Sequence, residues 1–196
     1  VITASVAEAA EAAAKYLADG VPILAEERVA MRRELSALVA RSPFGQGAAW
    51  PVVETVQRQG ICVEVVAPAP SLSPALAAEA AELGLRLATE LGVVGVLAVE
   101  LFETVDGRLL VNELAMRPHN SGHWTMDGAV TSQFEQHVRA VCGLPLGDPR
   151  QLTGAVMINL IGTDLNYDWL KLPLVHLHWQ LTAHRLGRMQ NRAVPN

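Results

Sequence analysis

The chain has 196 residues, with 15 Lys and Arg against 20 Asp and Glu, and therefore a formal net charge of −5. Hydrophobic residues make up 51% and charged residues 18% of the chain, which excludes a disordered polypeptide and allows one sizeable buried core. The acidic balance excludes a basic surface for nucleic acid. No stretch approaches the roughly 20 continuous apolar residues of a membrane span.

The first half of the chain predicts two helices with strands between them. Residues 5–18 are Ala-rich, and Ser5 and Gly20 are typical start and stop signals of a helix. Strand-like segments bounded by turn-rich separators follow at residues 22–26, 34–41, 50–56 and 61–67. Residues 73–91 predict a second amphipathic helix, which Gly92 ends. Because the strands follow one another without helices, we expect an antiparallel sheet.

The clearest feature is a β-hairpin in the second half. Residues 93–103 and 109–114 are strand-like, and the Asp-Gly pair at 106–107 is a favoured two-residue turn. This turn sets Glu100 opposite Glu113 on one face of the hairpin. Like charges directly across a sheet destabilise it unless a cation or a raised pKa compensates them. Such oxygen ligands suit Mg²⁺ that bridges substrate phosphates, and a pair of solvated surface acids is the alternative.

The same register predicts the neighbours of the acid pair. Phe102 and Val111 fall on its face, whereas Asn112 points to the opposite face and needs a bulge or a twist to reach it. We therefore expect a partly apolar surrounding for the two acids.

The remaining segments add a helix and two strands. Residues 131–141 predict a third helix, residues 155–161 a buried strand and residues 175–179 one more strand. Cys62 and Cys142 have no metal-type spacing. We expect both to be small buried side chains of a protein in a reducing compartment, the cytoplasm.

A polar stretch follows the hairpin directly. Residues 117–125, Arg-Pro-His-Asn-Ser-Gly-His-Trp-Thr, combine a guanidinium, two imidazoles, an amide and two hydroxyls, and the Pro and Gly favour a loop. Arg117 suits bidentate binding of a phosphate or carboxylate. His119 and His123 have a zinc-like spacing only on a helix, so zinc is disfavoured. A hydrogen-bonded turn without further function is the alternative.

An acidic cluster lies at the start of the predicted sheet. Glu26, Glu27, Arg28 and Val29 follow a strand-like segment, and Glu34 belongs to the next one. A strand-end backbone can bind an adenine edge, and a nearby acid can bind ribose hydroxyls. Paired surface acids are the alternative interpretation.

One stretch closely resembles a known family. It is VNELAMRPHNSGHWTMDGAVTSQFEQHVRA, residues 111–140, and it is similar to the N5-carboxyaminoimidazole ribonucleotide synthases, the ATP-grasp carboxylases of bacterial and fungal purine synthesis. The resemblance is ungapped and extends through LAVELFE, AEERVAMRRELSALVARS and VMINLIGTDLNYDWLKLPLVHLHW. It implies an α+β fold: an ATP-grasp large lobe with an antiparallel sheet flanked by helices, and a C-terminal linker or partial small β domain.

The resemblance also implies a reaction. ATP phosphorylates bicarbonate to carboxyphosphate, which yields CO₂, and the N5 amine of aminoimidazole ribonucleotide captures it. The implied cofactors are ATP and Mg²⁺, all ligands are small molecules, neither nucleic acid nor membrane is a partner, and family members are commonly homodimers. By position in the family motifs, the implied roles are adenine binding at Glu26, Glu27, Arg28 and Val29, ribose binding at Glu34, nucleotide contact at Gln57, Asn112 and Glu113, Mg²⁺ ligation at Glu100 and Glu113, catalysis at Arg117, His119 and Asn120, and substrate binding at Arg117, Ser121, His123, Arg185 and Arg188.

The chain also departs from the family. Gln57 stands where members commonly have a nucleotide-contacting His, and the tail at 185–192 keeps an Arg pair but lacks the family's Lys and His. Members begin with a further domain and a Gly-rich loop whose lysines hold ATP, whereas this chain starts at a Val and contains only Lys15 and Lys171. We therefore expect a chain truncated at its N-terminus.

The expected organisation follows from this. Residues 1–150 are predicted to be the incomplete ATP-grasp large lobe, and residues 151–196 a C-terminal extension with an atypical tail. The chain alone is expected to be impaired or inactive. A non-catalytic nucleotide- or partner-binding remnant is the alternative function, and a different ATP-grasp carboxylase or ribonucleotide ligase is a third.

Overall fold

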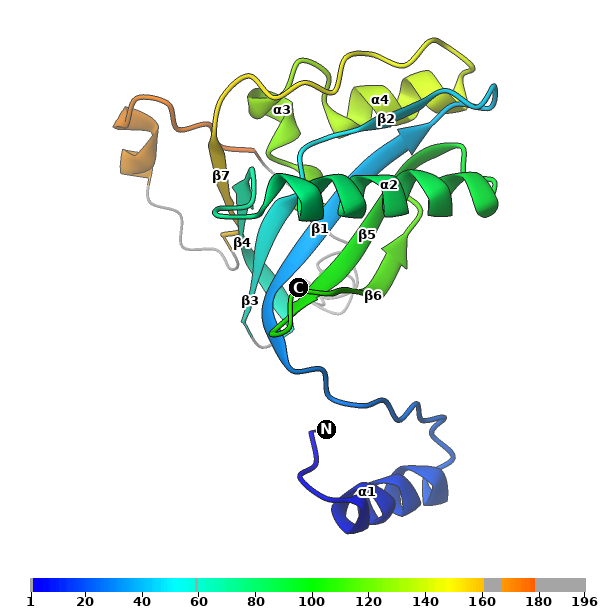
Figure 1. The fold of residues 1–196 in the computed structure, drawn as a ribbon. Coiled ribbons are helices and arrows are strands. Elements are labelled where there is room, and N and C mark those ends of the chain that lie inside the picture. The colour runs from blue at the N-terminus through cyan, green and yellow to red at the C-terminus, as the bar shows by residue number, and fades with distance from the viewer. Residues whose placement is uncertain (1, 59, 161–166, 179–196) are drawn as a thin grey trace, which may run out of the picture. The chain divides into compact units, whose positions relative to one another are not determined.

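The structure, a computed structural model, describes residues 2–58, 60–160 and 167–178 (Figure 1). The chain divides into two compact units, Val1–Asn159 and Leu160–Asn196. The sheet described below belongs to the first unit. Arg185 and Arg188, two of the predicted substrate-binding residues, lie outside the described residues.

The centre of the first unit is an antiparallel sheet, as predicted. Its strands are β1 (Met31–Arg41), β2 (Gly47–Ala49), β3 (Val53–Arg58), β4 (Ile61–Ala67), β5 (Gly95–Thr104), β6 (Leu109–Ala115) and β7 (Ala155–Ile158). Their spatial order is β6-β5-β1-β3-β4-β7, and β2 pairs with β1. Every pair is antiparallel. β1 and β5 are therefore flanked on both sides, which suits their long apolar runs.

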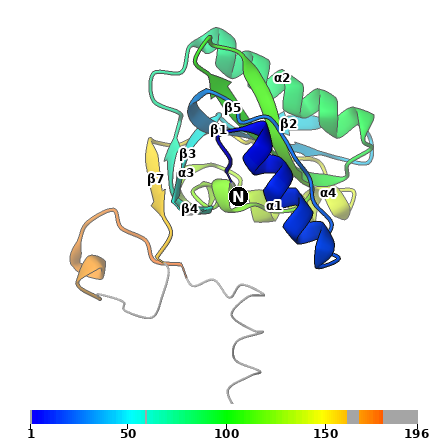
Figure 2. The ribbon, with the colours of Figure 1, turned by 90° about the horizontal axis from the view of Figure 1, so that it is seen from below.

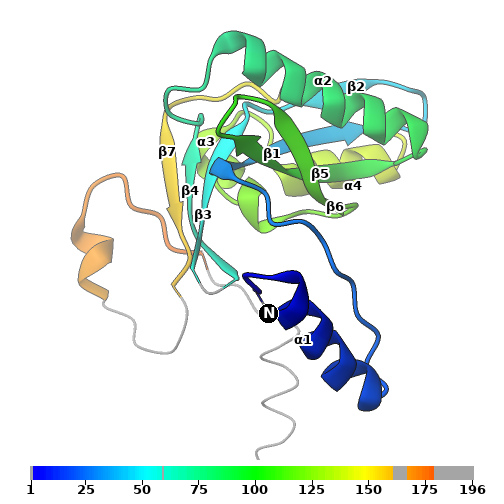
Figure 3. The same ribbon diagram turned by 60° about the horizontal axis from the view of Figure 1, so that its bottom comes forward.

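Two of the described helices cover the two faces of this sheet. The helices of the first unit are α1 (Val6–Ala18), α2 (Pro74–Glu90), α3 (Thr125–Gly128) and α4 (Gln133–Val141), with the short 3₁₀ turn η1 (Asn120–Gly122). A further 3₁₀ turn, η2 (Tyr167–Lys171), belongs to the second unit. α2 and α4 lie on opposite sides of β1 and β5 (Figures 2 and 3). Ser5, Ser73 and Ser132 accept backbone N–H bonds at the starts of α1, α2 and α4, so the predicted start of the first helix is confirmed. None of the described helices is long and apolar enough to cross a membrane.

Two apolar clusters hold the layers together. One lies between α2 and odd-numbered residues of β1 and β5, including Leu35 and Leu97. The other lies on the opposite face and joins even-numbered residues such as Leu38 and Val96 to Trp124. This alternation follows from the two-residue period of a strand. We call the second face the site face, because it also carries Glu34 and Glu100 further along the same strands.

Several predicted elements differ from the structure. Residues 22–26 form no strand, because this short run has no partner strand to pair with among the described residues. The predicted buried strand at 155–161 is the short β7, which is an edge strand with Val156 and Ile158 more than half exposed. No strand forms at 175–178. Residue 179, the end of that prediction, lies outside the described residues.

Two further corrections concern the side chains and a missed strand. The prediction that Cys142 is buried is wrong, because this residue follows α4 directly and is exposed. Cys62 is half-buried, and both thiols are free. The turn at 42–47 leads into β2, in which Ala49 pairs with Val39 of β1. The sequence pattern does not predict this short strand.

Candidate nucleotide and metal site

The β5–β6 hairpin brings Glu100 and Glu113 opposite each other, as predicted. The turn itself differs from the prediction. Thr104 N donates to Arg108 O at 2.9 Å and Gly107 N donates to Thr104 O at 3.0 Å, so the turn contains residues 105–107 rather than an Asp-Gly pair alone. Gly107 has a φ of +80°, which a residue without a Cβ adopts without strain.

A bulge at Asn112 restores the predicted pairing. The strands pair Phe102 with Leu110 near the turn, and the register shifts by one residue between Glu100 and Leu101. Val111 therefore pairs with Leu101 and lies on the other face, so its predicted place beside Phe102 is wrong. The bulge also turns Asn112 toward the site face, where its Nδ2 donates to Glu100 Oε2 at 3.2 Å.

The two acids repel each other electrostatically. The pKa of Glu100 is raised by burial first and by the charge of Glu113 second, while the Asn112 hydrogen bond and the Arg117 charge lower it. The pKa of Glu34 is likewise raised by burial and by Glu100, and a hydrogen bond from Gln57 lowers it. The negative charges of Glu34, Glu100 and Glu113 therefore lie close enough on the site face to affect one another, and a bound cation would reduce their repulsion.

The 117–125 stretch folds over this face and contains the 3₁₀ turn η1. His119 Nε2 lies 3.3 Å from Glu100 Oε1. On the other side of the ring, His119 Nδ1 lies 2.9 Å from Ser121 Oγ and accepts the Ser121 N–H at 3.4 Å. Ser121 Oγ in turn lies 2.7 Å from Ser36 Oγ in β1. The loop is thus bonded to both central strands.

A buried glutamine holds the same loop from behind. Gln133, the first residue of α4 and 0% exposed, accepts the His119 N–H at 2.8 Å and donates to His119 O at 2.7 Å. Gln133 N donates to Thr125 Oγ1 at 2.9 Å. The backbone of His119 is therefore fixed by two side-chain bonds, which orients its ring toward Glu100.

The other predicted residues of this loop have different surroundings. Arg117 is exposed, and its charge lowers the pKa of Glu100 and of His119, although burial is the larger cause for His119. Asn120 Oδ1 is buried without a hydrogen-bond partner among the described residues, an acceptor that a ligand N–H would satisfy. His123 stacks on Phe134 of α4, with ring centroids 5.6 Å apart.

The predicted adenine-binding residues lie in an extended segment before β1. Glu26, Glu27 and Arg28 are exposed. Glu27 and Val29 line a cavity of about 450 Å³ together with Thr104, Val105, Asp106, Arg108 and Leu110 of the hairpin and Ala30 of the same segment. By register, Leu110 is the partner of Phe102, two residues from Glu100 along β5.

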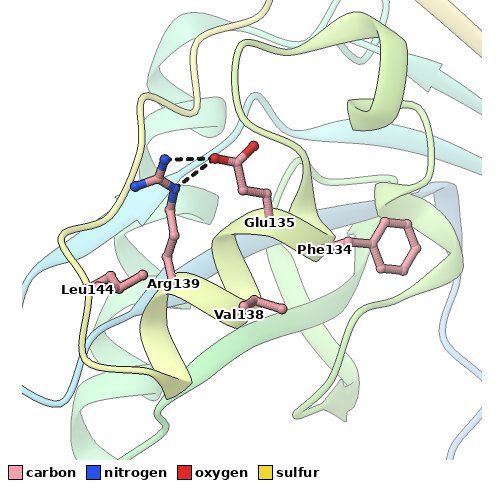
Figure 4. A pocket seen from close by; sticks show the side chains of 5 residues that line it. All are labelled: Phe134, Glu135, Val138, Arg139 and Leu144. Atoms are coloured by element: carbon pink, nitrogen blue, oxygen red, sulfur yellow. Dashed lines mark hydrogen bonds and ion pairs between the residues drawn. The ribbon is translucent and has the colours of Figure 1, made fainter.

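A second cavity, of about 460 Å³, lies on α4 (Figure 4). It is lined by Phe134, Glu135, Val138, Arg139 and Leu144, and none of these belongs to the predicted site. Figure 4 shows the Glu135–Arg139 ion pair across its rim, at 2.8 Å.

Three residues of the site were missed from the sequence. Ser36 and Gln133 are fully buried polar side chains that hold the His119 loop. Cys62 is half-buried, and the pKa of its thiol is raised by burial and by the charges of Glu100 and Glu34. In the sequence, Ser36 is a polar residue within an apolar strand and Gln133 lies at the start of a helix. Neither feature predicts which residue its side chain will bind.

The acid pair fits Mg²⁺ better than zinc. In the described part of the chain, no group of three His, Cys, Asp or Glu side chains could hold a metal on its own. Mg²⁺ is commonly bound by one or two carboxylates and completes its shell with phosphate oxygens and water. Glu100 and Glu113 supply such a pair, and their mutual repulsion favours a hard cation between them.

Known proteins resemble this chain over most of its length. The model of the ATP-grasp domain matches residues 1–134, more than half of the chain. The N5-carboxyaminoimidazole ribonucleotide synthase of Mycobacterium leprae is 72% identical over 93% of the chain and 45% of its own length. The Escherichia coli protein of the same name is 47% identical over 84% of the chain and 46% of its own length. The chain thus spans about half the length of these curated relatives.

Solved structures agree with these relatives. The N5-carboxyaminoimidazole ribonucleotide synthetase of Thermus thermophilus superposes with a TM-score of 0.85 at 43% identity, over 91% of this chain and 49% of that one. The Aspergillus clavatus synthase, solved with ADP and 5-aminoimidazole ribonucleotide, gives a TM-score of 0.68 at 35% identity, over 70% of this chain and 37% of its own. The antiparallel sheet, its flanking helices and the matched domain lead to one conclusion: the chain belongs to the ATP-grasp family.

Proposed function

We propose that this chain is the nucleotide- and metal-binding part of an N5-carboxyaminoimidazole ribonucleotide synthase. In this proposal the complete protein uses ATP to carboxylate 5-aminoimidazole ribonucleotide with bicarbonate through carboxyphosphate. The observation that carries the proposal is the Glu100–Glu113 pair, with Asn112 bulged toward it and His119 against it. The 72% identity to a relative of that name supports the choice of reaction.

Each part of the site has a proposed task. Glu27 and Val29, with Leu110, line the cavity that we assign to adenine, and Glu34 lies in β1 as the ribose acid. We assign Gln57, the hydrogen-bond partner of Glu34, to the nucleotide as well. Glu26 and Arg28 belong to the same extended segment.

The acid pair would hold Mg²⁺, which supplies charge neutralisation for the ATP phosphates when it is bound. Phosphoryl transfer depends mainly on positioning and electrostatic stabilisation, so the protein needs few reactive groups. Arg117 provides a positive charge next to this pair. It suits the oxygens of bicarbonate or carboxyphosphate, which a guanidinium binds in a bidentate manner.

His119 and Asn120 would act on the same substrates. His119 is partly buried, and burial together with the Arg117 charge lowers its pKa. Asn120 Oδ1 is a buried acceptor without a hydrogen-bond partner in the described part of the chain, which suits the N–H of the substrate amine. Ser121 and His123 are assigned to the ribonucleotide. A cytoplasmic location and a homodimer belong to the same proposal and rest on the family resemblance.

The test is turnover by the complete protein whose reading frame contains these 196 residues. We expect ATP hydrolysis that requires both bicarbonate and 5-aminoimidazole ribonucleotide, with the carboxylated product identified by mass spectrometry. Glu113→Gln should lower this turnover by at least about a hundredfold, because it removes a metal ligand. Glu135→Gln, an exposed acid on α4, is the matched control and should retain activity. A folded complete protein whose ATP hydrolysis does not respond to bicarbonate and 5-aminoimidazole ribonucleotide would contradict the proposal.

A non-catalytic nucleotide-binding remnant is the competing function. It predicts binding of Mg·ATP by the 196-residue chain without turnover by either protein. Calorimetric titration of the wild type and Glu113→Ala with Mg·ATP tests the metal site in both proposals. Equal affinities of the two proteins for Mg·ATP would contradict a metal site at Glu113. A different carboxylated or ligated product would instead indicate another ATP-grasp reaction.

A further inference from the structure

A buried polar contact of the site face joins two serines. Ser36 lies in β1, is 0% exposed and stands directly opposite Glu100 in the β1–β5 ladder. Its Oγ lies 2.7 Å from Ser121 Oγ, and Ser121 is 1% exposed. Among the residues that the structure describes, Ser121 is the hydrogen-bond partner of the Ser36 side chain. A hydroxyl buried this deeply in a sheet needs that partner.

The contacts of Ser121 set the direction of the protons. The backbone N–H of Ser121 donates to His119 Nδ1, so Nδ1 carries a lone pair. The Ser121 hydroxyl, 2.9 Å from the same nitrogen, must then also donate to it. Ser121 Oγ has one proton, which leaves it as the acceptor for Ser36.

The reverse orientation leaves a buried proton without an acceptor. If His119 Nδ1 carried the hydrogen, Ser121 would donate to Ser36, and the buried Ser36 hydroxyl would have no acceptor among the described residues. The forward orientation satisfies all three groups. It leaves the hydrogen of the neutral ring on Nε2, which lies 3.3 Å from Glu100 Oε1.

We propose that Ser36 is a positioning residue that selects the Nε2–H tautomer of His119 through Ser121, so that the imidazole presents an N–H donor to the site. A donor at Nε2 binds an anionic oxygen, of which Glu100 Oε1 at 3.3 Å is the example in this structure, whereas the other tautomer presents a lone pair and repels such an oxygen. The link to catalysis rests on the proposed function, since only that function gives His119 an anionic substrate. The tautomer itself depends on this chain alone.

The first experiment reads the tautomer directly. Two-bond ¹H–¹⁵N spectra of the ¹⁵N-histidine-labelled chain are recorded at a pH of about 8, above the ordinary imidazole pKa. His119→Gln assigns the resonances. In the wild type, His119 should show one protonated and one unprotonated nitrogen with widely separated ¹⁵N shifts. In Ser36→Ala the two shifts should move toward each other as the second tautomer becomes populated.

Two further variants make the result specific. Ser121→Ala should shift the His119 resonances at least as far, and Ser36→Ala added to it should cause no further change. Ser42→Ala is the matched control, because Ser42 is 1% exposed and follows β1 directly, and its hydroxyl accepts the loop N–H groups of Phe44 and Gln46. It should leave the His119 spectrum unchanged. A wild-type tautomer in folded Ser36→Ala, or an equal change in Ser42→Ala, overturns the proposal.

The second experiment uses the complete protein. Ser36→Ala should lower kcat by up to about tenfold, which is the scale of one hydrogen bond, with KM for Mg·ATP unchanged. Ser42→Ala should change neither. A fall in kcat without any change in the tautomer would also overturn the proposal. If the wild type shows no turnover, the proposed function fails, while the spectra still decide the role of Ser36.

Discussion

Glu100 and Glu113 face each other across the β5–β6 ladder, one residue beyond a bulge that aims Asn112 Nδ2 at the Glu100 carboxylate. The pair costs the folded protein stability in the absence of a cation, because both charges lie on one face of a sheet. The charge of Glu113 also raises the pKa of Glu100, and the size of this effect can be measured.

Replacing Glu113 by Gln should lower the pKa of Glu100. The charge of Glu113 is the second cause that raises this pKa, and burial, the first cause, remains in the variant. The pKa should therefore fall toward its ordinary value, and burial should still oppose the lowering effects of Asn112 and Arg117. Carbon-detected NMR titration of the Glu100 carboxyl in wild type and variant measures it. An unchanged pKa would show that the two carboxylates do not interact.

The same substitution should stabilise the fold only at higher pH. Because the pKa of Glu100 is raised on folding, the stability linked to its proton is present below about 4.5 and is lost as the pH rises through the raised value. Glu113→Gln reduces that loss. Urea unfolding without Mg²⁺ should show a gain in the free energy of unfolding at about pH 7.5, and none at about pH 3.5. A gain of equal size at both values would contradict this account.

Glu103 should be the acid whose loss most destabilises the sheet. It is 4% exposed, and its carboxylate lies 2.5 Å from Arg33 Nε and 3.4 Å from Arg32 in the neighbouring β1. Glu103→Gln should cost about 2–4 kcal/mol, because Glu54 is then the one ionic partner left to Arg33 among the residues that the structure describes. Glu135→Gln, which breaks the half-exposed pair in Figure 4, should cost less than about 1 kcal/mol. Equal losses in urea unfolding would refute the buried cluster.

Two buried glutamines of α4 offer a matched pair of variants. Gln133 holds the N–H and C=O of His119, and Gln136 holds those of Gly147 in the same way, at 2.7 and 2.9 Å. Each Gln→Ala change should cost about 2–3 kcal/mol, since it leaves buried backbone groups unpaired. Only Gln133→Ala should also reduce turnover of the complete protein beyond what its stability explains. Equal activities in the two folded variants would mean that Gln133 is purely structural.

Gly84→Ala should destabilise the protein although it improves the helix. Alanine is favoured over glycine in a helix by about 1 kcal/mol. A Cβ at Gly84, however, would lie 2.9 Å from Val39 Cγ1, where α2 packs on β1. We expect a net loss of about 1–3 kcal/mol by thermal and urea unfolding. In a Val39→Ala background, Gly84→Ala should cost less stability than it does in the wild type. Strictly additive losses of the two substitutions would argue against this contact.

The sequence predicts the acid pair correctly for an incomplete reason. The turn is one residue longer than an Asp-Gly turn, and the bulge at Asn112 is also one residue, so the two irregularities cancel at Glu100 and Glu113. Between them the register is shifted, so a regular two-residue hairpin predicts the wrong face for Val111. Periodicity carries no information about a bulge, because a bulge is set by side-chain contacts across the strands.

The supporting residues lie beyond what a sequence pattern predicts. Ser36 and Gln133 act through partners that are 85 and 14 residues away along the chain, and such partners follow from tertiary packing alone. The strand predicted at 22–26 shows the opposite error, since an apolar run without a neighbour to pair with stays extended. Helices with a serine cap and a clear apolar face were the most predictable elements.

The edge strand β7 has a practical consequence for handling the protein in concentrated solution. It pairs with β4 alone among the described strands, and Val156 and Ile158 are 60% and 63% exposed. Open edges with apolar side chains are templates for pairing between copies, and a lysine on such an edge blocks that pairing. Val156→Lys should therefore raise the concentration at which light scattering first detects aggregates. Since β7 and β6 are at opposite ends of the sheet order, this solubilising change leaves the acid pair untouched.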